Sequence, residues 1–303
     1  MNRNVIARIC VMSLAVVAIW FVADARGDLL FSDNCYTTTL SSDVNQDIAT
    51  RTGGKYAGTG YLYAANYSAN TKVGESTYNY EDIRLGPGVS SSSAWAYIWL
   101  NQQLKGEDSA GGLELTWTAS ATLSSGTAYG TSWFTVGVGA DEIGNTVDYR
   151  PLLSSTAGGV FVGFRLGTTD GSNNYASPCQ MMVHEDGVAQ SIVPIPNWLS
   201  GALEVPAVDH TFVMKVTGVG SDNPFSATTP LNIKLYVDGA ATPVLDYTTA
   251  NYYPNNYIGM LSYGYCRLNL DSWSVSQIPE PSTLALLTCG LFGLLAYAWR
   301  KRR

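Results

Sequence analysis

The sequence predicts an all-β protein whose body is one antiparallel sandwich or barrel. Apolar and polar residues alternate strictly in several segments, which is the pattern of a strand with one buried and one solvated face. Glycine-rich and Asp-Gly turn signals separate these segments, and no segment of the body shows a convincing amphipathic helix. Many short strands spread over about 250 residues indicate a sandwich or barrel.

Three segments show the alternation most clearly: 113–119, 134–138 and 231–237. In 134–138 the polar face is predicted to carry Thr135 and Gly137. Further strand-like runs are 61–65, 78–85, 94–100, 160–166, 180–184, 211–217, 257–263 and 268–276. Turn signals lie at Gly86-Pro87-Gly88, Asp170-Gly171, Asp186-Gly187 and Asp238-Gly239. The last two are predicted to be two-residue hairpin loops.

Residues 1–25 have the features of a secretory signal peptide. Arg3 and Arg8 give a positive start, and an apolar run follows at 9–22. Ala23-Asp24-Ala25 matches the A-x-A pattern that precedes a cut. Because a membrane span needs about 20 apolar residues, this run predicts a signal helix that is removed after Ala25.

The other end of the chain carries three features in order. Pro279-Glu280-Pro281 is followed by an apolar stretch at 284–299 and by four cations at 300–303. The stretch, about 16 residues, can just cross a bilayer as a transmembrane helix, and the cations would hold its end in the cytoplasm. The arrangement resembles the PEP-CTERM sorting signal of exported bacterial proteins. This resemblance implies transient membrane insertion and cleavage near the motif by an exosortase, which delivers the body to the cell surface or extracellular matrix. A permanent tail anchor is the alternative.

Residues 26–278 are predicted to form one domain. The segment 231–239 resembles the strand, Asp-Gly turn and strand of laminin-G-like, concanavalin-like jelly rolls, and 257–259 and 268–275 resemble their closing strands. Asp33-Asn34 after an apolar start resembles the opening strand. The resemblance implies an antiparallel jelly-roll sandwich and leaves the function open, because this architecture carries lectins, hydrolases and inert spacers.

The body is more acidic than the whole chain. The formal net charge is −7, but six cations lie in the terminal segments, which leaves 11 cations against 23 anions over residues 26–283. An acidic surface repels nucleic acid and anionic membranes, so neither is expected as a partner. It suits neutral glycans, cations or simply solubility outside the cell.

No catalytic residue is predicted. Hydrolases of the concanavalin-like architecture usually carry a Glu-x-Asp-x-Glu strand, and the sequence has none. Its adjacent acid pairs, Glu81-Asp82, Glu107-Asp108, Asp141-Glu142 and Glu185-Asp186, would point to opposite faces of a strand. His184 and His210 are predicted to lie in exposed turns. The expected function is therefore non-enzymatic, structural or glycan-associated. The alternative is a glycoside hydrolase or lyase with a dispersed site on the concave sheet face.

One strand carries an aromatic stripe. Trp95, Tyr97 and Trp99 would share a face by alternation, and Phe161 and Arg165 could flank them from the strand at 160–166. Aromatic rings can stack on the apolar faces of sugars, so these residues form a candidate glycan site. The alternative is that they simply fill a core.

Two further features concern ligands and covalent bonds. Asp170, Asn173 and Asn174 lie in an oxygen-rich loop that could bind calcium or could be a plain turn; no other cofactor is predicted. The body has three cysteines, and export permits a disulfide. If the first and last strands are neighbours, as the jelly-roll resemblance implies, Cys35 could pair with Cys266 and leave Cys179 over. Three unpaired cysteines, or another pairing, are the alternatives.

Overall fold

The structure is a computed structural model that describes most of the body and part of the C-terminal helix. The described residues are 27–35, 51–65, 71–73, 83–85, 95–123, 133–141, 158–165, 180–194, 209–263, 266–279, 290, 291, 293–295, 297, 298, 300 and 301. In the body these residues form fifteen strands and one short 3-10 helix, η1 (Gly106–Ser109), so the predicted all-β class is confirmed. The predicted signal helix at 1–25 lies outside the described residues.

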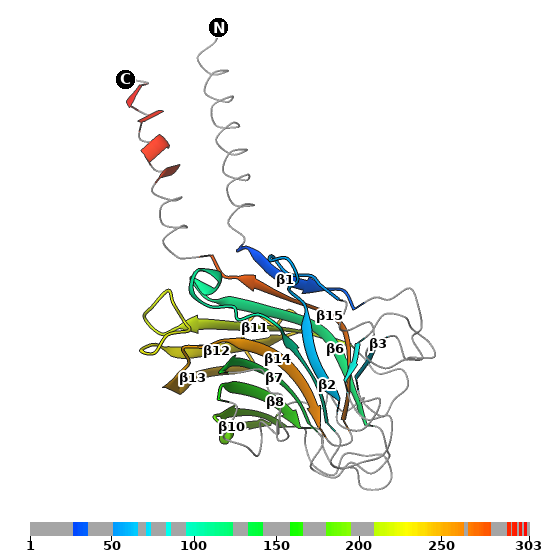
Figure 1. Cartoon of the computed structure of the whole chain (residues 1–303). Helices are drawn as coiled ribbons and strands as arrows, with labels where there is room; N and C mark the ends of the chain where they lie inside the picture. The colour runs from blue at the N-terminus through cyan, green and yellow to red at the C-terminus, as the bar shows by residue number, and fades with distance from the viewer. Residues whose placement is uncertain are drawn as a thin grey trace.

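The first sheet has eight strands. Its order is β13, β12, β11, β6, β15, β4 and β3, with β1 also paired to β15 (Figure 1). These strands are β1 (Leu29–Asp33), β3 (Thr71–Val73), β4 (Ile83–Leu85), β6 (Leu113–Leu123), β11 (His210–Gly218), β12 (Pro230–Val237), β13 (Leu245–Tyr252) and β15 (Cys266–Gln277). Every pairing is antiparallel.

The second sheet has seven strands in the order β10, β9, β8, β7, β14, β5 and β2, again antiparallel throughout. These strands are β2 (Tyr61–Ala65), β5 (Trp95–Leu100), β7 (Trp133–Ala140), β8 (Val160–Arg165), β9 (Gln180–Glu185), β10 (Val188–Pro194) and β14 (Tyr257–Tyr263). The strand-like runs predicted from the sequence give no range for β3, β10 or β13, although the predicted hairpins imply a strand after Gly187 and after Gly239. Of the run predicted at 78–85, the structure describes the part in β4.

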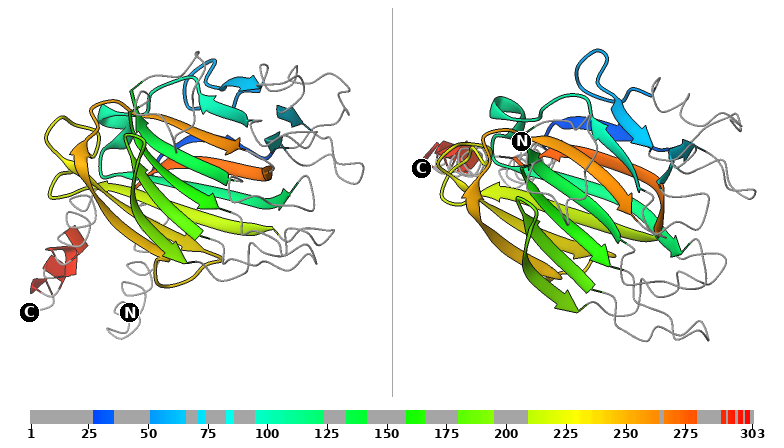
Figure 2. Two further views of the ribbon diagram at one scale, coloured as in Figure 1. Left: turned by 90° about the horizontal axis from the view of Figure 1, so that it is seen from below. Right: turned by 60° about the horizontal axis from the view of Figure 1, so that its bottom comes forward.

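The two sheets stack as layers and bury one apolar core between them (Figure 2). Aromatic rings cross from sheet to sheet at its centre. Phe212 of β11 lies edge-on to Phe134 of β7 at 6.2 Å and to Phe164 of β8 at 5.4 Å, measured between ring centroids. Phe134 and Phe164 in turn stack at 4.4 Å. This interdigitation fixes how the layers lie on one another.

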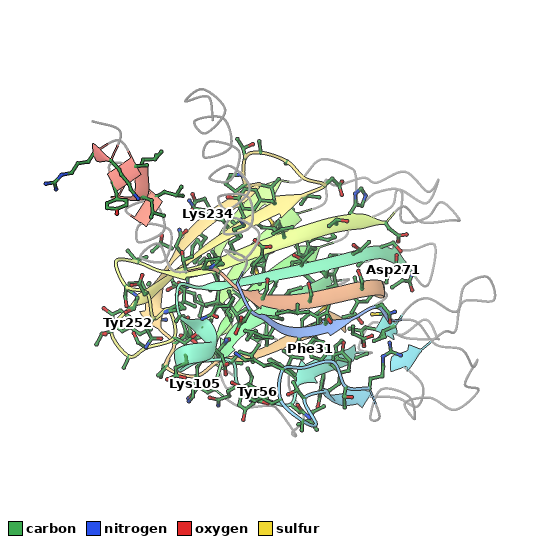
Figure 3. All side chains as sticks on the ribbon, turned by 90° about the horizontal axis from the view of Figure 1, so that it is seen from above. Phe31, Tyr56, Lys105, Lys234, Tyr252 and Asp271 are labelled. Carbon is green, nitrogen blue, oxygen red and sulfur yellow. The ribbon has the colours of Figure 1, made fainter. Side chains whose placement is uncertain are left out.

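The outer face of the eight-stranded sheet is polar, as alternation predicted. In β12, and in β6 from Leu113 to Ala119, every second residue is buried and the residues between are partly exposed. Two cross-strand ion pairs join this face to neighbouring strands, Glu114–Lys215 at 3.2 Å and Lys234–Asp246 at 3.4 Å. Lys234 is labelled in Figure 3. These strands therefore have one buried and one solvated face.

Strand β7 departs from that expectation. Thr135 and Gly137 were predicted to face solvent, but all eight residues of β7 are buried. The physical reason is that the outer face of the seven-stranded sheet carries a second cluster of buried side chains. Alternation predicted the pleat of β7 correctly and its environment wrongly.

The two predicted Asp-Gly hairpins behave differently. Asp186 and Gly187 form a two-residue loop between β9 and β10, with φ angles of 50° and 80°, as predicted. Asp238 and Gly239 also adopt positive φ angles, 51° and 71°. The chain after them, however, resumes a strand only at Leu245, so this connection is a longer loop that begins with the predicted turn.

The first and last strands pair in one sheet, as the jelly-roll resemblance implied. β1 runs antiparallel to β15, with Phe31 opposite Val275 and Asp33 opposite Trp273. β6 occupies the other side of β15. The body is therefore an antiparallel jelly-roll sandwich, and its two chain ends meet at one place in the eight-stranded sheet.

Candidate functional site

The aromatic stripe lies on the outer face of the seven-stranded sheet, the face turned away from the other layer. Ala96, Ile98 and Leu100 of β5 point into the core between the sheets. Tyr97 and Trp99, between them in sequence, belong to the separate outer cluster. We call this cluster the outer-face cluster; it consists of Tyr97, Trp99, Ala140, Phe161 and Leu261, with Tyr257 packed against it.

Glycines allow the rings of this cluster to lie over neighbouring strands. Gly259 of β14 is opposite Trp99, and a Cβ at this glycine would lie 2.5 Å from the Trp99 ring. Gly137 of β7 is opposite Phe161, whose ring covers it. Trp99 and Phe161 therefore meet across two intervening strands, edge to face, with centroids 6.2 Å apart.

The predicted glycan residues are thus partly brought together, but they are buried. Trp99 is 1 % exposed, and Tyr97 and Phe161 are each 3 % exposed. The backbones of Trp95 and Arg165 lie in β5 and β8, while their side chains are outside the described set. In this state the three described rings are core-like, the alternative weighed for them in the sequence.

Two polar side chains on the same face were missed by sequence reasoning. His184 of β9 is opposite Phe161, and Thr135 of β7 is opposite Leu261. His184 was predicted in an exposed turn but is 3 % exposed, because it ends a strand whose outer face is covered. Within the described set, neither its ring nitrogens nor the Thr135 hydroxyl has a hydrogen-bond partner. Burial lowers the pKa of His184 from 6.5 to about 4, so the ring is neutral at pH 7.

Glu185, the next residue, points the opposite way and joins the two layers. It is 1 % exposed, and its carboxylate accepts hydrogen bonds from groups of β13 and the segment after it. The donors are the hydroxyl of Tyr247 (2.6 Å), the hydroxyl of Tyr253 (3.2 Å), and the amides of Ala250 (2.9 Å) and Asn251 (3.2 Å). Beside the carboxylate, the pKa of each tyrosine is raised, first by burial and then by Glu185. We call this set the Glu185 latch.

The described carboxylates do not converge into an acid pair on the outer face. Asp141 accepts from Asn255 at 3.2 Å. Asp186 accepts from the Gly159 amide at 3.1 Å and from Asn251 at 2.8 Å. Since Glu185 points the other way, the described part of this face holds no carboxylate that could act as a glycosidase acid or nucleophile.

The predicted calcium loop, with Asp170, Asn173 and Asn174, lies outside the described residues. Among the residues that are described, no group of three or more His, Cys, Asp or Glu side chains could hold a metal ion.

The predicted Cys35–Cys266 disulfide is not formed in this structure, where both cysteines are buried free thiols. The strands pair as expected, but the register separates the sulfurs. Asp33 is opposite Trp273, so Cys35 falls near Asp271, five residues from Cys266 along β15. Five residues of strand span ~16 Å, far more than the roughly 4.4–6.8 Å that a disulfide allows between Cα atoms.

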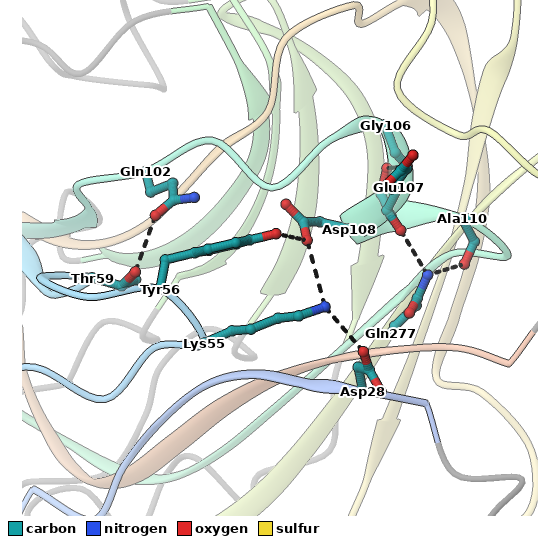
Figure 4. A network of polar contacts seen from close by, with 11 residues as sticks. Asp28, Lys55, Tyr56, Thr59, Gln102, Gly106, Glu107, Asp108, Ala110 and Gln277 are labelled. Carbon is teal, nitrogen blue, oxygen red and sulfur yellow. Dashed lines mark hydrogen bonds and ion pairs between the residues drawn. The ribbon is translucent and has the colours of Figure 1, made fainter.

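The end of β15 is fastened to the body just before the predicted sorting motif. The Gln277 amide donates to Asp28 O and the Ile278 amide to Gly112 O, both at 2.8 Å. The Gln277 side chain donates to Glu107 O at 2.8 Å and to Ala110 O at 3.1 Å (Figure 4). We call these four hydrogen bonds the terminal clamp.

A polar network surrounds the clamp (Figure 4). Lys55 contacts Asp28 at 3.0 Å and Asp108 at 4.0 Å, and the Tyr56 hydroxyl donates to Asp108 at 2.7 Å. Gly27 packs directly against Gln277, so the start of the described body lies beside its end. Both cuts predicted from the sequence would therefore fall at one place on the folded body.

The two stacked sheets and the clamped end of β15 define a β-sandwich protein whose chain continues into a C-terminal tail. The comparison with family models identifies this tail: residues 277–303 match the PEP-CTERM protein-sorting motif. The motif indicates a protein that is exported and held at the membrane before processing. The structure describes part of a C-terminal helix at 290–301. Among the described residues, this segment included, no helix is long and apolar enough to span a membrane.

Comparisons of the body returned distant solved structures. A legume lectin-like domain from Entamoeba histolytica shares 10 % identity at a TM-score of 0.46, covering 80 % of this chain and 98 % of that one. Lectin UEA-II in complex with galactose shares 10 % identity at a TM-score of 0.48, and the match covers 82 % of this chain and 98 % of that one. Basic winged bean lectin with Tn-antigen shares 12 % identity at a TM-score of 0.48, and the match covers 81 % of this chain and 96 % of that one. No curated protein matches the sequence. Nothing about the ligands of this chain follows from these matches, and its fold is taken from its own strand order.

Proposed function

We propose that this chain is a surface or extracellular-matrix protein that an exosortase sorts through its C-terminal tail, with the β-sandwich as the delivered part. The position of the motif carries the proposal. Pro279 directly follows Ile278, which hydrogen-bonds to Gly112 of the body. Removing the tail after the clamp therefore leaves every described strand in place, so the body can be released or transferred as a folded unit.

Replacing Pro279-Glu280-Pro281 by three alanines tests the proposal. The apolar stretch and the terminal cations remain, so the variant should accumulate as an uncleaved precursor in the membrane fraction. A truncated chain that ends at Ile278 serves as the control, because it lacks the tail and should be secreted without C-terminal processing. Normal cleavage and delivery of the alanine variant would contradict the assignment, and an uncleaved wild-type chain would favour a permanent anchor.

We further propose that the delivered body is non-enzymatic and associates with neutral extracellular glycan through the outer face of the seven-stranded sheet. His184 and Thr135 favour this role. Both are buried on that face without a hydrogen-bond partner among the described residues, and sugar hydroxyls can both donate and accept hydrogen bonds. Trp99 and Phe161 beside them offer ring faces and edges. Because all four are buried, this role requires the face to open when a glycan binds.

A glycan array probed with the exported body tests the second role. His184→Leu and Thr135→Val should each weaken binding by roughly tenfold or more, since each removes a hydrogen-bonding group from a buried contact. Asp246→Asn, at an exposed ion pair on the other sheet, should leave binding unchanged. If the body binds no glycan, it is a structural module alone; if it binds glycan and both variants bind as well as the wild type, the site does not lie on this face. Repeating the array with a chelator tests whether calcium at Asp170, Asn173 and Asn174 takes part.

A further inference from the structure

The terminal clamp lies where processing must take place. β15 lies inside the eight-stranded sheet, with β6 on one side and β1 and β4 on the other. Its last residue, Gln277, is opposite Leu113 of β6 and also bonds to Asp28. The backbone groups just before the motif are therefore already paired inside the body.

The chain between the clamp and the apolar stretch is short. Residues 279–283 separate Ile278 from Leu284. Fully extended, they reach about 20 Å, similar to the radius of gyration of about 18 Å expected for a body of some 250 residues. While the apolar stretch is in the membrane, the body is held close to the bilayer with its clamp end toward it.

An enzyme that cuts near the motif must bind chain on both sides of the cut. Each backbone amide and carbonyl can pair with the enzyme only if it is not already paired with the body. On the amino side of the motif these groups belong to the clamp and to β15. The body therefore competes with the enzyme for the same short piece of chain.

We propose that the terminal clamp limits the rate of tail removal, with Gln277 as the positioning residue that holds the motif against the body. This rests on the proposed exosortase processing. The clamp opens when the hydrogen bonds of Gln277 and Ile278 to the body break. The enzyme can then bind the backbone on the amino side of the motif. The clamp also keeps the cut on the carboxyl side of Ile278, so β15 is never shortened.

Pulse-chase labelling of the full-length chain in the producing cell measures the rate of tail removal. Gln277→Ala removes the two side-chain bonds of the clamp and should speed processing by at least about fivefold, the factor expected for each net hydrogen bond. Inserting Gly-Ser-Gly-Ser between Ile278 and Pro279 leaves all four bonds intact, moves the motif away from the body, and should speed processing at least as much. Gln102→Ala is the matched control: its side chain accepts from Thr59 at the same end of the body and does not contact the tail (Figure 4).

The mass of the released body gives a second readout that a loss of stability would not imitate. The wild-type body should end beyond Ile278, and the insertion variant should end four residues further from the clamp. Unchanged or slower processing of the insertion variant, or a wild-type cut before Ile278, would overturn the proposal. The insertion decides the question even if Gln277→Ala folds poorly. If the wild-type chain is not processed at all, the proposed function fails; if it is processed and both variants match it, only the role of the clamp fails.

Discussion

Removing the Glu185 carboxylate should destabilise the body more than any exposed charge change. The carboxylate accepts from two tyrosine hydroxyls and two backbone amides of the facing layer. A hydrogen bond to a charged group contributes roughly 1.5–3 kcal/mol. Ala250 and Asn251 are exposed, so their amides can turn to water, while Tyr253 is buried and Tyr247 is partly buried. The two tyrosine bonds therefore dominate, and Glu185→Ala should lower the free energy of unfolding by about 3–6 kcal/mol.

Urea unfolding of the tail-free body, followed by tryptophan fluorescence, measures this loss. Glu114→Ala is the matched control, since Glu114 forms a part-exposed pair with Lys215 that is worth at most about 1 kcal/mol. Tyr253→Phe should cost less in the Glu185→Ala background than in the wild type, because the two residues share one bond. If Glu185→Ala lowers the free energy of unfolding no more than Glu114→Ala does, or if Glu185 and Tyr253 show no coupling energy, the latch does not join the layers.

Three further predictions follow from the outer face and the cysteines. Trp99→Ala should lower the free energy of unfolding by about 3–5 kcal/mol, the cost of a buried cavity, and a small loss in a melting experiment would show the ring to be accessible. The pKa of His184, about 4 in the folded body against 6.5, means that the unfolded chain takes up its proton first as the pH falls. Stability should therefore drop between roughly pH 6.5 and 4 by up to ~1.4 kcal/mol per pH unit, and unfolding curves of His184→Leu should show a shallower drop. Cys35 and Cys266 should resist alkylation in the folded body, because burial raises the pKa of both thiols. Both should react with the alkylating agent in urea without reductant. Peptide mapping that finds either cysteine unalkylated in urea would contradict the free-thiol state.

Much of the fold could be predicted from local pattern. Alternation placed 113–119 and 231–237 in strands with the correct residues buried, because the strand period is a property of the backbone itself. The Asp186-Gly187 loop was predictable for a similar reason, since its left-handed φ angles favour these residue types. β13 was missed because a polar edge strand has no clear apolar alternation.

The candidate site was less predictable. Trp99 and Phe161 could be assigned to suitable faces, but their contact depends on Gly259 and Gly137, which lie in other strands and leave room for the rings. His184 and Thr135 carried no signal, because a lone histidine or threonine beside a turn or strand usually faces solvent. A clue was present in Gly137 and Gly139, alternate glycines of β7, which mark a face where large neighbours come close.

The sequence by itself determined the sorting motif and the all-β class of this protein. The Pro-Glu-Pro motif before an apolar stretch and the strand period are each read over a short stretch of chain, and the motif match at 277–303 and the strand order confirmed them. Tertiary structure alone decided the register of β1 on β15, which separates Cys35 from Cys266, and the burial of the outer face. It also decided that Gln277 is clamped beside the start of the body. These properties depend on contacts between strands that are separated along the chain, and no local pattern carries information about which distant strand will lie beside another or in which register.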